Sequence, residues 1–243
     1  MEETSATPAT DWGLIARAIG EPSLEQRLAM QALLAQYLPA LKAHVLAKWR
    51  VRLEQAEDLL QAFLAAKVVE DNLIAQASQE KGKFRHFLRR TLDDFIIDQY
   101  RRENARKRSP GKLAPLAEAD LMPDENAGAA DEAFEVAWVR EVIASALERM
   151  RQECADGGRS DIWGVFECRV VKPFLENERA TPYEQVVTQW GLKSPIQAAN
   201  VLATGKRMFE RNLRAVLRGY TPGEGGIDAE IRELREILSR CRA

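Results

Sequence analysis

The chain has 243 residues, of which 46% are hydrophobic and 30% charged, and its formal net charge is −2 at pH 7. This composition is typical of a globular protein with one large domain or two small ones. No run approaches the roughly 18 apolar residues of a membrane span. The polar, acidic start from Met1 lacks the basic and apolar parts of a secretion signal. We therefore expect a cytoplasmic protein without a membrane partner.

Residues that could carry catalysis or hold a metal are scarce. The chain has three cysteines and two histidines, namely Cys154, Cys168, Cys241, His44 and His86. They form no CxxC or HxxxH spacing, so we expect no metal site and three ordinary thiols, as in a reducing compartment. The sequence also has no glycine-rich phosphate-binding loop. These observations argue against an enzyme and predict no cofactor.

Helical spacing dominates the first half of the chain. Residues 1–23 are expected to form an extension with a short helix from Asp11 to Ile19. A first domain is expected over residues 24–108. Its predicted helices run from Leu24 to about Trp49, from about Gln55 to Val68, and from Gly82 to Arg108.

The helix from Gly82 to Arg108 is predicted to have two chemically different faces. Its apolar residues fall at helical spacing and predict a core-facing stripe of Phe84, Phe87, Leu88, Thr91, Leu92, Phe95 and Ile96. Arginine, lysine and histidine lie largely off that stripe. A helix that is aromatic on its buried side and cationic elsewhere suits a nucleic-acid partner.

Charge is strongly segregated along the chain. Residues 81–112 contain eleven Lys and Arg against four Asp and Glu, a net charge of +7, whereas residues 113–135 contain seven Asp and Glu and no Lys or Arg, a net charge of −7. Such local fields, rather than the net charge, decide where a polyanion binds. We interpret residues 109–134 as an acidic linker that could shield the basic helix.

The second half is again helical. A second domain is expected over residues 135–218, with helices beginning near Asp131, from Trp163 to Leu175, from Tyr183 to Gln189 and from Ser194 to about Arg218. Pro173 is expected to kink or end the second of these. Residues 219–243 are expected to form a tail helix. No strand pattern is persuasive, so the predicted fold is all-α: two small helical bundles joined by a flexible acidic linker.

The second bundle is predicted to contain a helix-turn-helix. Thr181-Pro182 and Ser194-Pro195 each predict an N-cap followed by a first-turn proline, and Gly191 predicts the tight turn between the helices. The second helix would present its start to the major groove. Its candidate base and phosphate contacts are Lys193, Ser194, Gln197, Asn200, Thr204, Lys206, Arg207 and Arg211. Plain bundles contain similar turns, so this pattern alone leaves a structural role equally open.

These segments together resemble bacterial RNA polymerase sigma factors. Residues 56–64 read AEDLLQAFL, which is similar to the family signature EDLxQxxF. Residues 83–88 and 98–102 resemble its promoter-melting and −10-reading helix, and the helix-turn-helix resembles its −35-reading domain. A chain with only these two domains resembles the extracytoplasmic-function (ECF) group, from about Thr10 to Leu217. The resemblance implies a non-enzymatic initiation subunit.

The resemblance implies RNA polymerase core as a partner, through the β′ clamp coiled coil and the β flap. Glu57, Asp58 and Gln61 would face the clamp, and acidic residues suit a basic partner surface. The same two acids near a helix start could instead complement the helix dipole. Promoter DNA is the second implied partner, and an anti-sigma factor is a further partner that the family allows.

The resemblance also implies two DNA contacts in the first domain. The loop Gln76–Lys83 would receive a flipped −10 base and the next helix would hold the melted strand, with candidate residues Ser78, Gln79, Lys81, Lys83, Arg85, His86, Arg89 and Arg90. Upstream duplex phosphates would contact Arg101, Arg102, Arg106, Lys107 and Arg108. Alternatively, the loop is a simple surface turn, and Arg89 and Arg90 pair with Asp93 and Asp94.

Three hypotheses follow. The first is a sigma factor that reads −35 and −10 DNA and helps to melt the latter. The second is a conventional helix-turn-helix regulator that binds duplex DNA without core polymerase, and the third is an enzyme with an unrecognised site. Under the first, we expect residues 113–135 or the tail from Gly219 to lower the DNA affinity of the free protein.

Overall fold

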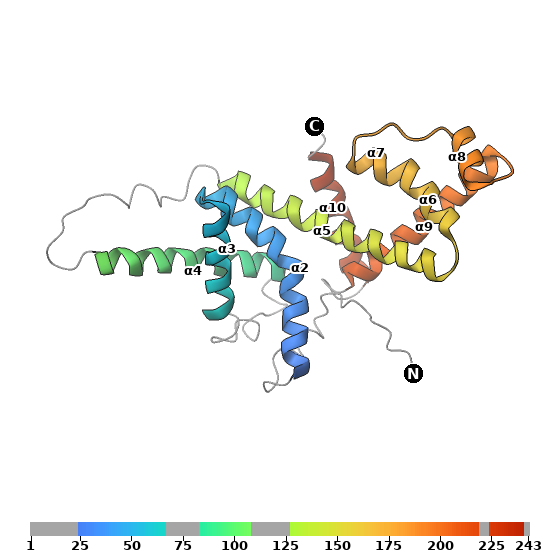
Figure 1. The fold of residues 1–243 in the computed structure, drawn as a ribbon. Coiled ribbons are helices and arrows are strands. Elements are labelled where there is room, and N and C mark those ends of the chain that lie inside the picture. The colour runs from blue at the N-terminus through green and yellow to red at the C-terminus, as the bar shows by residue number, and fades with distance from the viewer. Residues whose placement is uncertain (1–23, 67–82, 108–126, 219–223, 241–243) are drawn as a thin grey trace. The chain divides into compact units, whose positions relative to one another are not determined.

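The structure, a computed structural model, describes residues 24–66, 83–107, 127–218 and 224–240, and all regular structure in these residues is helical (Figure 1). The expected short helix at Asp11–Ile19 lies outside the described residues. Among the described helices, none is both long and apolar enough to cross a bilayer. The first elements are α2 (Leu24–Trp49), α3 (Leu53–Phe63), α4 (Phe84–Lys107) and α5 (Ala127–Asp156). They are followed by α6 (Ser160–Phe166), the π-helix η5 (Glu167–Val171), α7 (Lys172–Leu175), α8 (Tyr183–Trp190), α9 (Pro195–Leu217) and α10 (Glu224–Arg240).

The chain divides into two compact units. Unit 1 comprises residues 1–141 and 219–243, and unit 2 comprises Val142–Arg218. This division differs from the expected one, which began the second domain at residue 135 and set residues 219–243 apart as a tail. The helix α5 already begins at Ala127, inside the expected linker, because Ala130 and Phe134 are fully buried and belong to the core of unit 1. The tail helix α10 also belongs to unit 1.

The core of unit 1 is built from the apolar faces of its helices. Five residues of the predicted α4 stripe are buried, while Phe87 and Thr91 are half-buried. Aromatic rings join the helices edge to face: Phe63 lies 5.7 Å from Phe95, and Tyr37 lies 5.5 Å from Phe84, between ring centroids. The helix α10 adds four buried apolar side chains to this core: Ile227, Ile231, Leu234 and Ile237.

A buried histidine links three helices of unit 1. His44 of α2 is fully buried; its Nε2 lies 2.9 Å from Asp93 Oδ1 of α4, and its Nδ1 lies 3.4 Å from the Ala130 carbonyl oxygen of α5. Lys48 Nζ donates to the second Asp93 oxygen at 2.7 Å. Burial alone would raise the pKa of the Asp93 carboxyl, but the hydrogen bonds and charges of His44 and Lys48 outweigh it and lower that pKa.

Acid is expected to destabilise unit 1 through Asp93. Because its folded-state pKa is lowered, its contribution is complete above the unfolded value of about 3.9 and is lost as the pH falls through the folded-state pKa. Between about pH 5 and pH 2, wild-type protein should therefore lose more unfolding free energy than the Asp93→Asn variant. Hydrogen exchange of α2 and α4 amides in urea measures this. Asp98→Asn, an exposed substitution in the same helix, should keep the wild-type slope, and an equally steep Asp93→Asn profile would contradict the prediction.

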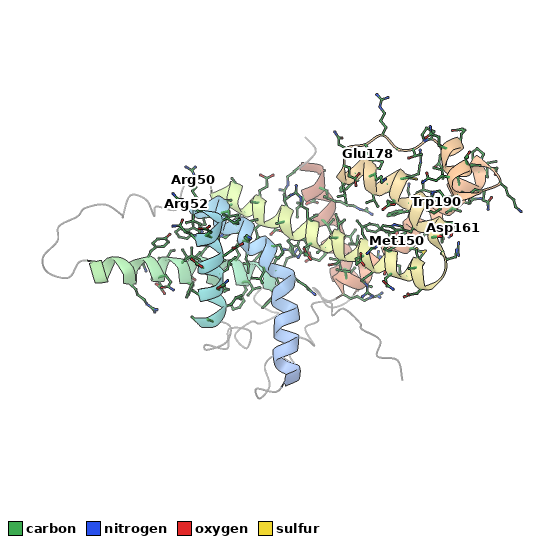
Figure 2. All side chains as sticks on the ribbon, viewed as in Figure 1. Arg50, Arg52, Met150, Asp161, Glu178 and Trp190 are labelled. Carbon is green, nitrogen blue, oxygen red and sulfur yellow. The ribbon has the colours of Figure 1, made fainter. Side chains whose placement is uncertain are left out.

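The core of unit 2 lies among α5, α6, α8 and α9. Its fully buried members include Met150, Val165 and Val186, and the half-buried Trp190 packs against them (Figure 2). Cys154 and Cys168 are free and buried, and burial raises the pKa of both thiols, which makes them unreactive. They fit the expectation of ordinary thiols; Cys241 lies outside the described residues.

The helical segment from Ser160 to Leu175 contains one irregular turn. The π-helix η5 directly precedes Lys172 and Pro173 and separates α6 from α7. Because proline lacks a backbone N–H and clashes with the preceding turn, a wider turn before it allows the helix to continue. The helix ends at Leu175, two residues after the proline, as the sequence predicted.

The connection between α8 and α9 is short and well capped. Gly191 ends α8 with φ +61°, a left-handed conformation that favours glycine, and Leu192 N–H donates to the Val187 carbonyl. Ser194 is the N-cap of α9 and Pro195 its first residue, which confirms that prediction. The N-cap of α8 is Pro182, not Thr181, and no side chain caps this helix.

Candidate nucleic-acid interface

The helix α3 separates an apolar face from a polar one. Ala56, Leu60 and Phe63 are buried in unit 1, whereas the positions assigned to core polymerase, Glu57, Asp58 and Gln61, are exposed. Spacings of three and four residues place these three side chains on one solvent-facing surface. Glu57 also forms an ion pair of 2.5 Å with Lys42 of α2. A surface pair of this kind contributes little to stability, so it leaves Glu57 accessible to a partner.

Lys83, directly before α4, and Arg85 of α4 contact the carboxylates of α10. Lys83 pairs with Glu230 at 2.8 Å and also with Glu233. Arg85 Nη1 donates to Glu230 at 2.9 Å, and its Nη2 pairs with Glu233 at 2.8 Å. The Arg85 side chain is only 3% exposed, and its guanidinium carbon lies 4.0 Å from the centre of the Trp138 ring. In this arrangement Arg85 is inaccessible to a DNA strand, although the sequence assigned it to the melted −10 element.

The charges around Arg85 are mutually compensating. Burial would lower the pKa of the Arg85 guanidinium, but the charges of Glu230, Glu135 and Glu233 outweigh burial and raise that pKa above its ordinary value. Burial would raise the pKa values of Glu135 and Glu233. The His86 hydrogen bond and the Arg85 charge lower the first pKa, and the Lys83 hydrogen bond and the Arg85 charge lower the second. Arg85, Glu135 and Glu233 are therefore charged at neutral pH. Removing one member of such a buried set is costly, because it leaves the opposite charge without compensation.

His86 extends this cluster towards solvent. Its Nε2 lies 3.0 Å from Glu135 Oε1, and ligand atoms of His86, Glu135 and Glu233 lie within 4.8 Å of one another. One imidazole and two carboxylates could ligate a cation by chemistry alone. However, the Arg85 guanidinium pairs with both carboxylates and already supplies the positive charge. We therefore interpret the cluster as an ion-pair network, not as a metal site.

Further along α4 the basic residues become accessible. Arg89 is 20% exposed and pairs with Asp131 of α5 at 3.1 Å. The alternative pairing of Arg89 with Asp93 is not formed, because the two Asp93 oxygens contact His44 and Lys48 instead. Besides His86, the exposed members of the predicted set in the described part of α4 are Arg90, Arg101 and Arg102. Arg106 and Lys107 lie in the last turn of α4, and Ser78, Gln79, Lys81 and Arg108 lie outside the described residues.

Two of the residues assigned to −35 DNA stabilise the start of α9. Ser194 Oγ accepts a hydrogen bond of 3.2 Å from the Gln197 N–H, and Gln197 Oε1 accepts one of 2.6 Å from the Lys193 N–H. These are capping contacts at the start of α9, although Gln197 accepts from the residue before the N-cap rather than from the N-cap itself. Thr204 Oγ1 donates to the Asn200 carbonyl at 3.0 Å. Lys193 and Asn200 are exposed.

The second half of α9 has a cationic outer surface. Lys206, Arg207 and Arg211 are exposed, as expected for phosphate contacts. Arg211 pairs with Glu153 of α5. An open depression in this region is lined by Arg207, Glu210, Arg211, Arg214 and Arg218. Arg214 and Arg218 extend the predicted cationic set towards the end of the helix.

Sequence reasoning missed the acidic residues that face Lys83 and Arg85. Glu230 and Glu233 are three positions apart on α10, beside its apolar residues Ile231 and Leu234, and Glu230 is only 4% exposed. A carboxylate at a core-flanking position requires a cationic partner, so this spacing carried a usable signal. It could not identify Arg85, which lies 145 positions away.

No protein-family model, curated protein or solved structure matches this chain.

Proposed function

We propose that this protein is a dissociable initiation subunit of bacterial RNA polymerase, a sigma factor of the ECF type, which reads −35 and −10 DNA and assists promoter melting. The observation that carries the proposal is the exposed surface of Glu57, Asp58 and Gln61 on α3, in a helix whose opposite face is buried. A conventional regulator has no use for this surface. It matches the clamp-binding signature that the sequence resembles.

The geometry of unit 2 supports the DNA-binding part of the proposal. The helices α8 and α9 pack together through Val186, Ala198 and Leu202, and the Gly191 turn leaves the start of α9 exposed. This arrangement suits a helix-turn-helix, in which the second helix enters the major groove. Arg207 and Arg211 on the same helix would neutralise phosphates. The protein is not an enzyme under this proposal, because binding free energy drives strand opening.

The proposal also gives α10 a regulatory role. Glu230 and Glu233 form ion pairs with Lys83 and Arg85, the cations that would otherwise contact the melted strand. The free protein would therefore bind DNA weakly, in line with the expected effect of the tail. Residues 113–126 of the acidic segment lie outside the described residues. Of the remainder, Asp131 pairs with Arg89, and Glu135 pairs with Arg85 and His86.

Charge reversal on α3 tests the proposal. Glu57→Lys combined with Asp58→Lys should reduce capture of core polymerase at least tenfold, because like charges across an interface cost several kcal/mol. Promoter-dependent run-off transcription should fall equally. The matched control, Glu176→Lys with Glu178→Lys, makes the same charge change on exposed residues of unit 2 (Figure 2). It should retain core capture.

Three outcomes separate the hypotheses. Wild-type protein that neither captures core nor adds a promoter-dependent product contradicts the sigma-factor proposal. Tight, specific duplex binding without core favours a conventional regulator. Equal loss of core capture in the α3 variant and the matched control shows a general charge effect and removes the support that α3 gives.

A further inference from the structure

The outer stripe of α9 has an unusual composition at its start. Ile196, Asn200, Ala203 and Arg207 follow one another at spacings of four, three and four residues, so they share one face. Ile196 is 75% exposed, which makes it more exposed than Leu53 or Leu175, the other large exposed apolar side chains in the described part of the chain. An isoleucine so exposed on an otherwise polar helix is available for a contact outside the chain.

The neighbouring polar residues of this turn are already engaged. Gln197 is held in the capping contacts with Ser194 and Lys193. Thr204 Oγ1 bonds the backbone of its own helix. The amide of Asn200, by contrast, makes no hydrogen bond to any other described residue and is exposed. Within this stripe, Ile196 and Asn200 are therefore exposed side chains that make no contact with the helix cap, while the exposed Lys193 precedes the first turn of α9.

The chemistry of these two side chains selects particular bases. The thymine methyl group is the apolar feature that the major groove offers, and an asparagine amide matches the N6 and N7 of adenine. The first three positions of the stripe hold no Arg, Lys, Asp or Glu, the side chains that suit guanine or cytosine edges. Arg207 lies on the same face and is exposed, so its positive charge complements the phosphates of the duplex.

We propose that α9 reads A·T base pairs, with Ile196 in contact with a thymine methyl group and Asn200 hydrogen-bonded to an adenine. This inference rests on the proposed function and deepens it, because it names the bases and the two specificity-determining residues. Gln197, which the sequence suggested as a base contact, instead stabilises the helix start. Residues 206, 207 and 211 contact phosphates and carry no base preference.

Modified bases test the inference on the full-length chain. Duplexes are first selected from a pool with a randomised upstream element, both with and without core polymerase. Each thymine of the selected element is then replaced by deoxyuridine, which lacks only the methyl group, and each adenine by 7-deazaadenine, which lacks N7. One deoxyuridine should weaken wild-type binding about fourfold, the effect expected for one buried methyl group. One 7-deazaadenine should weaken it about tenfold.

Variants assign each effect to a side chain. Ile196→Ala should abolish sensitivity to deoxyuridine, and Ile196→Val should restore part of it. Asn200→Ala should abolish sensitivity to 7-deazaadenine while leaving the response to deoxyuridine intact. Leu175→Ala, which removes an exposed apolar side chain of α7, should behave as wild type. Because Ile196 and Asn200 are exposed, these substitutions should leave the fold unchanged.

The outcomes distinguish this inference from the proposed function. A selected element with guanine and cytosine at the sensitive positions, or wild-type binding that is indifferent to deoxyuridine, overturns the inference and leaves DNA recognition standing. If no duplex is enriched with or without core polymerase, both fail. If duplexes are enriched without core capture, the protein is a conventional regulator, and the same modified duplexes still decide the base assignment.

Discussion

The combined substitution of Glu230→Gln and Glu233→Gln is expected to raise the affinity of the free chain for single-stranded DNA by about tenfold. These two carboxylates pair with Lys83 and Arg85, so their neutralisation releases two cations for phosphate contacts. It also leaves Arg85 with Glu135 as its remaining charged partner, which weakens the docking of α10. Fluorescence anisotropy with a 20-nucleotide strand at fixed salt measures the affinity, and hydrogen exchange of α10 amides reports its release.

Two controls separate this mechanism from a general change in charge. Glu176→Gln with Glu178→Gln makes the same charge change on exposed residues of unit 2, and Glu236→Gln alters an exposed residue of α10 itself. Both should leave the affinity within about twofold of wild type, because exposed charges interact weakly with distant sites. Equal gains in all three variants would sink the mechanism. Adding Lys83→Gln to the double variant should reverse part of the gain.

The substitution Gly164→Ala is expected to destabilise unit 2 by about 3 kcal/mol. A Cβ atom on Gly164 would lie 1.7 Å from Trp190 Cζ2, and two further ring atoms lie within 2.3 Å. The ring has little freedom to retreat, since Trp190 is the last residue of α8 and Gly191 turns the chain directly behind it. Hydrogen exchange of α6 and α9 amides, measured as the temperature rises, reports the loss of unfolding free energy.

A second glycine provides the matched control for this substitution. A Cβ atom on Gly128, near the start of α5, meets no atom within 4 Å, so Gly128→Ala should be neutral or stabilise by up to about 1 kcal/mol. The double variant Gly164→Ala with Trp190→Ala should lose less than the sum of the single losses, because the small side chain removes the clash. Strict additivity would show that Trp190 is not the cause. Duplex binding should fall with Gly164→Ala, since Trp190 positions the Gly191 turn before α9.

Features that depend on local sequence could be predicted. The spacing of Phe84, Leu88, Leu92 and Phe95 indicated the buried stripe of α4, and Ser194-Pro195 indicated the start of α9. Both follow from helix geometry or from a side chain that caps its own backbone, so they need no knowledge of the rest of the fold. Exposure of Glu57, Asp58 and Gln61 follows in the same way from the apolar spacing of α3.

Features that depend on tertiary contacts could not. Spacing suggested that Asp93 pairs with Arg89, yet the fold brings His44 and Lys48 to the carboxylate from a different helix. The run before Asp131 was interpreted as a linker because it is acidic and rich in small residues. Alanine is also a good helix former, and Ala130 is buried in the core of unit 1, so the segment forms the start of α5 instead of a linker. The exposure of Ile196 depends on which face of α9 packs against unit 2, and the sequence alone does not determine that face.

The contact between Arg85 and Glu230 has a consequence for the order in which a new molecule matures. The two residues are 145 positions apart, so a ribosome adding about 5–20 residues per second makes Glu230 on the order of 10 s after Arg85. All of unit 2 is synthesised within that interval, because Val142–Arg218 lies between them. Each nascent chain therefore exposes Lys83 and Arg85 to surrounding RNA until α10 emerges and joins the rest of unit 1.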